Sequence, residues 1–149
     1  MLANPRLAGF LTEALTHEMS VVQQYLTQAH LCELWGLDDE AVYFRKEASE
    51  ELGHAGMIIR HMLTLGLAPN ATRLKAVRPG RSLREMLLLD AQLELEAIHL
   101  YDEAMRLAER LRDPASSQLF GELLADEQGH YEEIQRMLNE LTEKERSNV

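Results

Sequence analysis

The sequence predicts an all-α protein that folds as a bundle of four helices. Apolar residues recur at helical spacing in four segments of the chain. The composition is rich in Leu, Ala, Glu and Met and only 5% aromatic, which suits helices better than strands. The 149 residues have the size of one domain, and a hydrophobic content of 46% is enough to fill one core. We therefore expect a single domain over residues 1–149.

The first predicted helix spans residues 5–35. Asn4 can cap its start, and Pro5 occupies the first helical position, where no amide donor is needed. Glu18 lies on the stripe that should be buried, so a carboxylate interrupts an otherwise apolar face. Gly36 marks the expected end of this helix. The apolar members of the stripe are Leu7, Leu11, Ala14, Val21 and Tyr25.

The second predicted helix spans residues 39–65, and Asp38 or Asp39 can cap its start. Its buried stripe again contains a carboxylate, Glu51. Gly66 and Pro69 stop the helix, so the first two helices form a hairpin. The apolar members of the stripe are Phe44, Ala48, Ala55, Ile58 and Met62.

Residues 67–81 contain prolines and basic side chains without apolar periodicity, so they form an extended connection. At ~3.3 Å per residue it can span ~50 Å, more than the ~42 Å of a 28-residue helix. It is therefore long enough to cross the bundle, and the second and third helices can run parallel. Ser82 with Glu85 matches a capping box for a helix over 83–111, and Asp113 caps a helix over 114–142. The polar residues after 142 are expected to fray.

A shift of 76 residues superposes the first helix pair on the second. A period this long that occurs only twice indicates two helical hairpins related by a pseudo-twofold axis. Each hairpin supplies one Glu and one Glu-x-x-His, whose side chains share a helix face. The superposed pairs are Glu18 and Glu94, Tyr25 and Tyr101, Phe44 and Phe120, Glu51 and Glu127, Gly53 and Gly129, and His54 and His130.

These positions predict a dinuclear metal site. Four buried carboxylates without a counter-charge would each cost several kcal/mol or would have to be protonated, whereas two divalent cations neutralise them. Carboxylate with imidazole suits Fe(II) and Mn(II), and the lack of thiolate argues against a structural zinc site. A single Glu-x-x-His is usually a surface feature, so the specificity lies in the whole set. The predicted metal-binding residues are Glu18, Glu51, His54, Glu94, Glu127 and His130.

Charge and cysteine usage restrict the partners and the compartment. A formal net charge of −10 argues against a nucleic-acid-binding surface. The single Cys32 can form no internal disulfide, which favours a reducing compartment, by default the cytoplasm. No apolar stretch approaches the ~18 residues of a membrane span, so no membrane partner is expected.

With these residues placed, the chain resembles a bacterioferritin over residues 5–142. The motifs are Glu18 within His-Glu-Met, the turn Trp35-Gly36-Leu37, the segment from Glu51 to His54, Glu94 within Leu-Glu-Leu, and the segment from Asp126 to His130. This resemblance implies a ferritin-like four-helix bundle of antiparallel hairpins with a long crossover. It also implies a ferroxidase that binds two Fe per chain and oxidises Fe(II) with O2 or peroxide, for iron storage or detoxification.

The resemblance assigns individual roles within the site. It implies that Glu51 and Glu127 bridge the two irons, while Glu18 with His54 and Glu94 with His130 complete the two ends. It further implies that Tyr25 assists oxidation by donating an electron without binding metal. Tyr101, on the pseudo-equivalent helix, is interpreted as a core residue. Glu47 and Glu50 are interpreted as part of a solvated helix face.

Two departures from the family pattern concern haem and assembly. Bacterioferritins often bind haem through a methionine directly after the second-helix glutamate, but here Leu52 stands there and offers no donor atom. We therefore expect no haem. The family also carries a short fifth helix that has no counterpart before Val149, which leaves a 24-subunit shell open. At least a homodimer is expected, with Met19, Val22 and Leu26 on outer faces.

Other functions remain open from the sequence. The main alternative is a rubrerythrin-like di-iron peroxidase, although the CxxC module that often accompanies such proteins is absent from the sequence. Another ferritin-like oxidase without mineral storage, including an oxygenase of small molecules, is also compatible with the pattern. A non-catalytic helical scaffold that holds metal only to neutralise its core is the remaining alternative.

Overall fold

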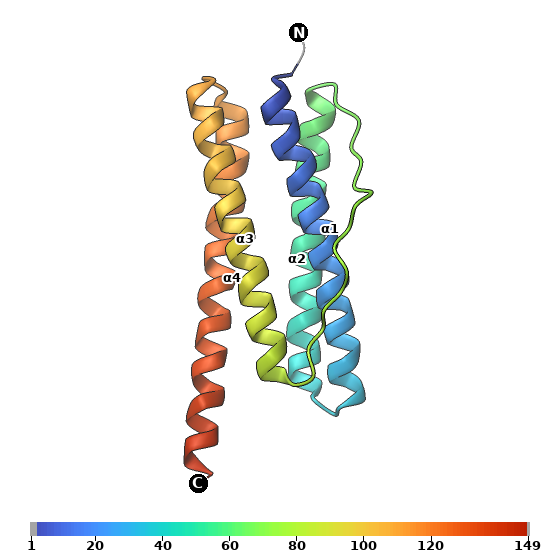
Figure 1. Ribbon diagram of the computed structural model, residues 1–149, viewed down its shortest axis with the longest axis vertical. Helices are drawn as coiled ribbons and strands as arrows, with labels where there is room; N and C mark the ends of the chain where they lie inside the picture. Colours follow the sequence, from blue (N-terminus) through green and yellow to red (C-terminus); the bar gives the residue numbers. More distant parts are fainter. Residues whose placement is uncertain (1–2, 149) are drawn as a thin grey trace.

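The computed structural model describes residues 3–148, which contain four helices and no strand. The helices are α1 (Pro5–Leu34), α2 (Asp38–Thr64), α3 (Leu83–Arg110) and α4 (Pro114–Ser147). Helices α1 and α2 form one antiparallel hairpin and α3 and α4 form another, and α1 packs against α3 while α2 packs against α4 (Figure 1). The predicted all-α, four-helix class is confirmed.

Three of the four helix starts carry the expected side-chain caps. Asn4 Oδ1 accepts hydrogen bonds from the backbone N–H of Arg6 at 3.0 Å and of Leu7 at 3.2 Å. Ser82 and Asp113 cap α3 and α4 in the same way. The cap predicted for α2 is wrong, since Leu37 occupies the capping position and makes no side-chain cap. The acids Asp38, Asp39 and Glu40 instead lie in the first turn, where their negative charges interact favourably with the positive end of the helix dipole.

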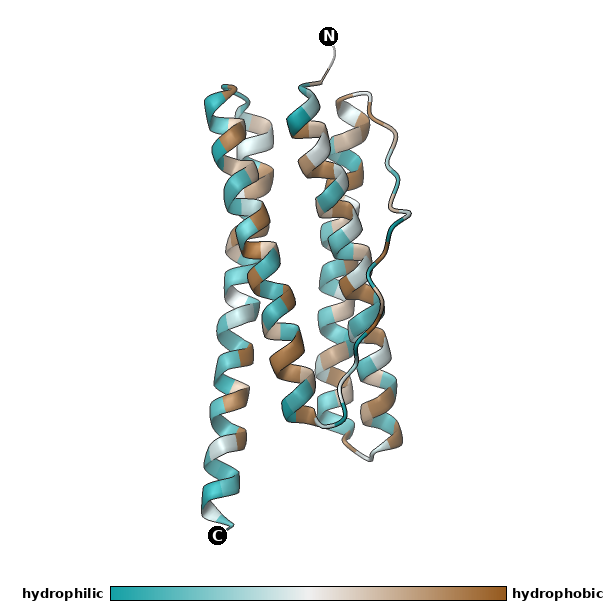
Figure 2. Ribbon diagram, in the orientation of Figure 1, coloured by the Kyte–Doolittle hydropathy of each residue, from teal (hydrophilic) through white to brown (hydrophobic). Residues whose placement is uncertain are grey.

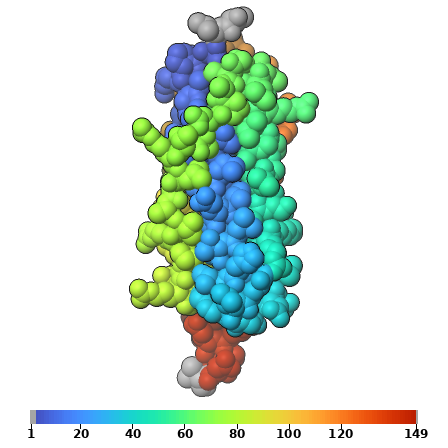
Figure 3. Space-filling model, turned by 90° about the vertical axis from the view of Figure 1, so that its right-hand side faces the viewer, coloured from blue at the N-terminus to red at the C-terminus, as the bar shows by residue number. Residues whose placement is uncertain are grey.

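The crossover between α2 and α3 runs the length of the bundle along α1, so α2 and α3 are parallel (Figures 1 and 3). Polar side chains of α1 hold it in place. Gln24 pairs with the backbone of Arg78, accepting from its N–H at 2.9 Å and donating to its carbonyl. One turn further on, Gln28 donates to the carbonyl of Pro79 at 3.1 Å. The crossover is therefore fixed to the bundle by paired backbone groups, although it has no regular secondary structure.

The core is divided into two apolar clusters, and Figure 2 shows apolar residues, in brown, recurring along each helix between hydrophilic ones. One cluster extends from Leu7 to Leu15 on α1 and includes Phe120 of α4. The other begins at Val21 on α1 and includes Phe44 of α2. Glu18 lies between these two runs of α1, so a buried polar layer separates the clusters.

Helix α4 continues five residues past the predicted end at residue 142. Lys144 and Arg146 lie in its last turn, where their positive charges interact favourably with the negative end of the helix dipole. Arg84 of α3 also pairs with Glu145 at 2.7 Å. These contacts hold the segment that was expected to fray. Within the described residues, no helix is both long enough and apolar enough to cross a membrane.

Candidate metal centre

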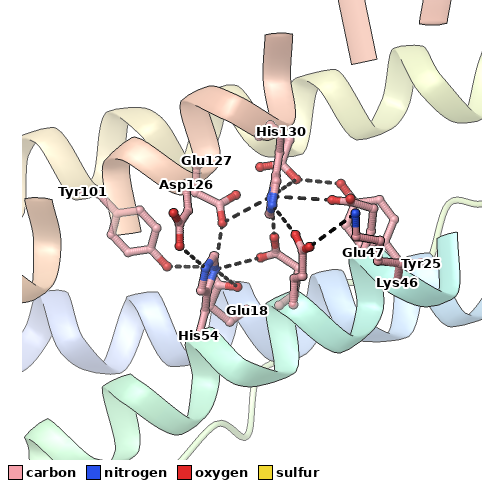
Figure 4. A network of polar contacts seen from close by, with 12 residues as sticks. Glu18, Tyr25, Lys46, Glu47, His54, Tyr101, Asp126, Glu127 and His130 are labelled. Carbon is pink, nitrogen blue, oxygen red and sulfur yellow. Dashed lines mark hydrogen bonds and ion pairs between the residues drawn. The ribbon is translucent and has the colours of Figure 1, made fainter. Parts of the chain in front are cut away.

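All six residues predicted to bind metal lie together in the polar layer between the two core clusters (Figure 4). One Glu comes from each of α1 and α3, and one Glu-x-x-His comes from each of α2 and α4. All six side chains are buried, the least buried being His130 at 9% exposure. The two hairpins therefore contribute equal halves of one site.

The six residues form two overlapping groups of potential ligands. The first group is Glu18, Glu51, His54 and Glu127, and the second is Glu51, Glu94, Glu127 and His130. Within each group one ligand atom per residue lies within 4.8 Å of the others, close enough for one ion to contact all four. Glu51 and Glu127 belong to both groups, and they come from different hairpins.

Each histidine directs Nδ1 towards the carboxylates of the site. His54 Nδ1 lies 2.9 Å from Glu127 Oε1, and His130 Nδ1 lies 2.9 Å from Glu51 Oε1. These contacts do not have hydrogen-bond alignment, and both Nδ1 atoms lack a hydrogen-bond partner. Both oxygens of Glu51 are likewise buried without one. Buried nitrogen and oxygen atoms left unpaired around a common centre fit metal ligands, because a cation would satisfy them all.

Without metal, protons and mutual contacts balance the buried charge. Burial raises the pKa values of Glu18, Glu94 and Glu127. Burial opposes ionisation of Glu51 as well, but contacts with Glu18 and the two histidines hold its pKa below the usual range. The pKa of His130 is raised to about 10 despite burial, because carboxylates surround the ring. The protons held here are those that divalent cations would displace.

A second pair of carboxylates contacts the histidines from the other side. A hydrogen bond joins His130 Nε2 to Glu50 Oε2 at 2.7 Å, and another joins His54 Nε2 to Asp126 Oδ2 at 3.0 Å. A carboxylate accepts, so Nε2 donates each hydrogen bond, and once a cation displaces the Nδ1 proton the neutral ring can present the lone pair of Nδ1 to the site. Glu50 and Asp126 are related by the same 76-residue shift. This positioning role was not predicted, although the 76-residue repeat already relates the two acids.

Two tyrosines contact the ends of the site. The Tyr25 hydroxyl donates to Glu94 Oε1 at 2.6 Å, and the Tyr101 hydroxyl donates to Glu18 Oε1. The two rings lie at opposite ends of the cluster in Figure 4. Both rings are fully buried. The interpretation of Tyr101 as a plain core residue is therefore incomplete.

Glu47 is also part of this region. Its side chain is only 2% exposed, and Oε2 lies 3.6 Å from His130 Nδ1. Burial raises the pKa of Glu47 to about 7. Its placement on a solvated face is wrong, and its spacing of four residues before Glu51 could have indicated a shared helix face.

A cavity of about 480 Å³ opens to the surface between α2 and α4, next to the two histidines. Glu50 and Asp126 line it on opposite helices, and His54 and His130 form part of its wall. At Gly53 and Gly129, an added Cβ would have no neighbour within 4 Å. Side chains at these two positions would project into open space, so glycine keeps the approach to the site wide.

Comparison with known proteins places these features in a family. The pattern of the ferritin family, described as a ferritin-like domain, matches residues 9–144. A bacterioferritin of Rhodobacter capsulatus is 34% identical over 139 residues, which cover 93% of this chain and 86% of that protein. A bacterioferritin of Streptomyces coelicolor is 35% identical over 139 residues, covering 93% and 83% of the two chains.

Solved structures show the same likeness. The structure of Rhodobacter capsulatus bacterioferritin, described as having a metal-free dinuclear site and a haem iron, matches with a TM-score of 0.90 and 34% identity. That match covers 93% of this chain and 87% of the other. Mycobacterium tuberculosis bacterioferritin BfrA matches with a TM-score of 0.92 and 28% identity, covering 97% of this chain and 90% of the other.

Proposed function

This chain belongs to the ferritin-like family, and from that premise we propose that it is a bacterioferritin-like ferroxidase, which oxidises Fe(II) for iron storage or detoxification. The observation that carries the proposal is the pair of overlapping ligand groups that share Glu51 and Glu127. Two such groups fit two divalent ions per chain, and four carboxylates match their four positive charges. In this family setting, Fe(II) is the substrate and O2 or peroxide the oxidant.

The proposed ligand roles follow from membership of the two groups. Glu51 and Glu127, which belong to both, would bridge the ions. Glu18 with His54 completes one end, and Glu94 with His130 completes the other. Because each bridging carboxylate lies on a different hairpin, both hairpins must be docked for either ion to have all its ligands.

The remaining residues prepare the site for its substrate. Glu50 and Asp126 line the cavity between α2 and α4, so an approaching cation meets two carboxylates before it reaches the histidines. The protons held by Glu18, Glu94 and Glu127 leave as the cations bind. Iron supplies the redox chemistry, and the protein supplies geometry, charge and exclusion of water.

The decisive experiment is rapid mixing of Fe(II)-loaded protein with O2 or with hydrogen peroxide, together with the amount of metal bound. We expect about two ions per chain and rapid oxidation followed by mineral formation. Turnover with peroxide alone would indicate a peroxidase of the rubrerythrin kind. Binding without oxidation would indicate a scaffold.

A double variant tests the assignment of the bridging residues. Replacing Glu51 and Glu127 by Ala should abolish metal binding and leave the helices intact, because alanine is a better helix former. Glu132→Ala, at an exposed position of α4, is the matched control and should load metal normally. Loss of helical structure in the double variant would instead assign the two residues a structural role.

A further inference from the structure

The two tyrosines of the site are equivalent in their contacts as well as in the sequence. Tyr25 reaches from α1 to Glu94 of α3, and Tyr101 reaches back from α3 to Glu18 of α1. Each hydroxyl therefore donates to the terminal glutamate of the opposite hairpin. One tyrosine serves each of the two ligand groups (Figure 4).

The packing of the two rings repeats as closely as their hydrogen bonds. The centroids of Tyr25 and Phe44 are 6.1 Å apart with an interplanar angle of 28°. The centroids of Tyr101 and Phe120 are 6.3 Å apart with an angle of 29°. A ring that merely filled the core would not need a buried hydroxyl aimed at a ligand carboxylate, because phenylalanine fills nearly the same volume.

We propose that Tyr101 is a second redox-active tyrosine, which supplies an electron at the Glu18 end of the centre as Tyr25 is expected to do at the Glu94 end. This proposal rests on the ferroxidase function proposed above, with O2 as the oxidant. Reduction of O2 to two waters consumes four electrons and four protons. Two Fe(II) ions supply two of these electrons, and the two tyrosines supply the other two.

The proton has a defined destination in each oxidation. As Tyr101 loses an electron to the oxygen being reduced, its O–H bond breaks and the proton moves along the hydrogen bond to Glu18 Oε1. The tyrosine is left as a neutral radical, so no uncompensated charge is created in a buried site. At the other end the same transfer runs from Tyr25 to Glu94 Oε1.

The two tyrosines differ in what lies beyond them. The ring centroids of Tyr43 and Phe44 are 5.1 Å apart in an edge-to-face arrangement. A series of aromatic rings, Phe44 and then Tyr43, therefore leads away from Tyr25. In the second hairpin, the position equivalent to Tyr43 is occupied by Leu119, and the position equivalent to Glu47 is occupied by Leu123. Beyond Phe120, the described residues give the Tyr101 ring no further aromatic partner. A radical on Tyr101 should therefore persist longer than one on Tyr25.

The test uses the full-length protein loaded anaerobically with two Fe(II) per chain, mixed with O2, frozen at set times and examined by electron paramagnetic resonance. We expect Tyr25→Phe to retain a tyrosyl signal that decays more slowly than that of the native protein. Tyr101→Phe should retain only the faster-decaying signal, and the double variant should have none. Tyr131→Phe, on α4 outside this pair, is the matched control and should behave as the native protein.

Released hydrogen peroxide gives a second readout. The double variant should release about one peroxide per two Fe(II), because only the irons then supply electrons, whereas the native protein should release much less. The inference is overturned if Tyr25→Phe abolishes the radical while Tyr101→Phe leaves it unchanged, or if the native protein oxidises Fe(II) without any tyrosyl signal. Failure of the native protein to oxidise Fe(II) would overturn the proposed function itself. Circular dichroism and metal loading of each variant exclude misfolding as the cause.

Discussion

Glu50 and His130 join the two hairpins through a hydrogen bond of 2.7 Å on the side of the imidazole that faces away from the metal site. Asp126 and His54 repeat this relationship at 3.0 Å with the hairpins exchanged. Each histidine is thus positioned by an acid that immediately precedes the glutamate proposed to bridge the ions from the other hairpin.

From this relationship we predict that Glu50→Ala weakens metal binding at the His130 end by about 10- to 100-fold, the usual effect of losing such a partner. In this variant the His130 ring loses the Glu50 acceptor that fixes its tautomer and its orientation. Calorimetric titration with Mn(II), which avoids oxidation, measures the change. Glu132→Ala should bind as the native chain does, and an unchanged affinity in Glu50→Ala would show that packing alone orients His130.

Asp90, a buried acid outside the ligand set, should contribute to the pH dependence of stability. Asp90 accepts a hydrogen bond from Gln28 at 2.9 Å, and burial raises its pKa from 3.8 to about 8. Between these values the folded chain keeps a proton that the unfolded chain releases, so this contribution to stability is complete below pH 3.8 and is lost as pH rises to about 8.

Asp90→Asn should remove this dependence, because asparagine keeps an acceptor oxygen and cannot ionise. We expect the melting temperature of the variant, relative to the native protein, to increase as pH rises through that window. Thermal unfolding of metal-free protein at several pH values measures it. Asp102→Asn, also on α3, is the control for a change of surface charge. A constant difference between Asp90→Asn and the native protein would mean that Asp90 is ionised throughout.

We predict that the native protein does not bind haem and that a methionine at position 52 restores binding. The Leu52 side chain lies on α2 with 54% exposure and offers only hydrocarbon to an iron. Protein reconstituted with haem should show no stoichiometric absorption band, while Leu52→Met should gain one. A bis-methionine spectrum from the native chain would contradict the prediction.

Assembly to at least a dimer is the fourth prediction. The Leu26 side chain on α1 is 44% exposed, an apolar surface that pairing of chains would cover, whereas Val22 proves to be buried within the chain. Sedimentation should show particles of at least twice 17.0 kDa, and Leu26→Asp should shift them towards the monomer because burying its charge is costly. Leu88→Asp on α3 tests whether any added charge has this effect. A native monomer would refute the prediction.

The sequence predicted the fold and the grouping of the six ligand candidates because both depend on helical periodicity. A carboxylate that interrupts an apolar stripe can be recognised without coordinates, as Glu18 and Glu51 were. The 76-residue repeat then placed the two hairpins about one centre. These features are local or repeated, so a single sequence contains them.

Other features could not be read in the same way. Whether Glu47 is buried depends on how closely α4 approaches α2, and whether Glu50 contacts His130 depends on the rotation of two helices about their axes. The start of α2 was also misassigned, since two adjacent aspartates resemble a cap although the chain enters the helix at Leu37. Such details follow from packing between segments distant in the sequence.

Under the proposed function, each bound ion would join the two hairpins and so stabilise the fold, because each ligand group takes residues from both hairpins. A ligand that binds only the folded state, at 100 times its dissociation constant, adds about 2.7 kcal/mol to the free energy of unfolding. Since proteases attack the unfolded chain, a chain starved of iron would be degraded sooner than a loaded one. The lifetime of the protein would then report the iron supply of its surroundings, with no separate sensor required.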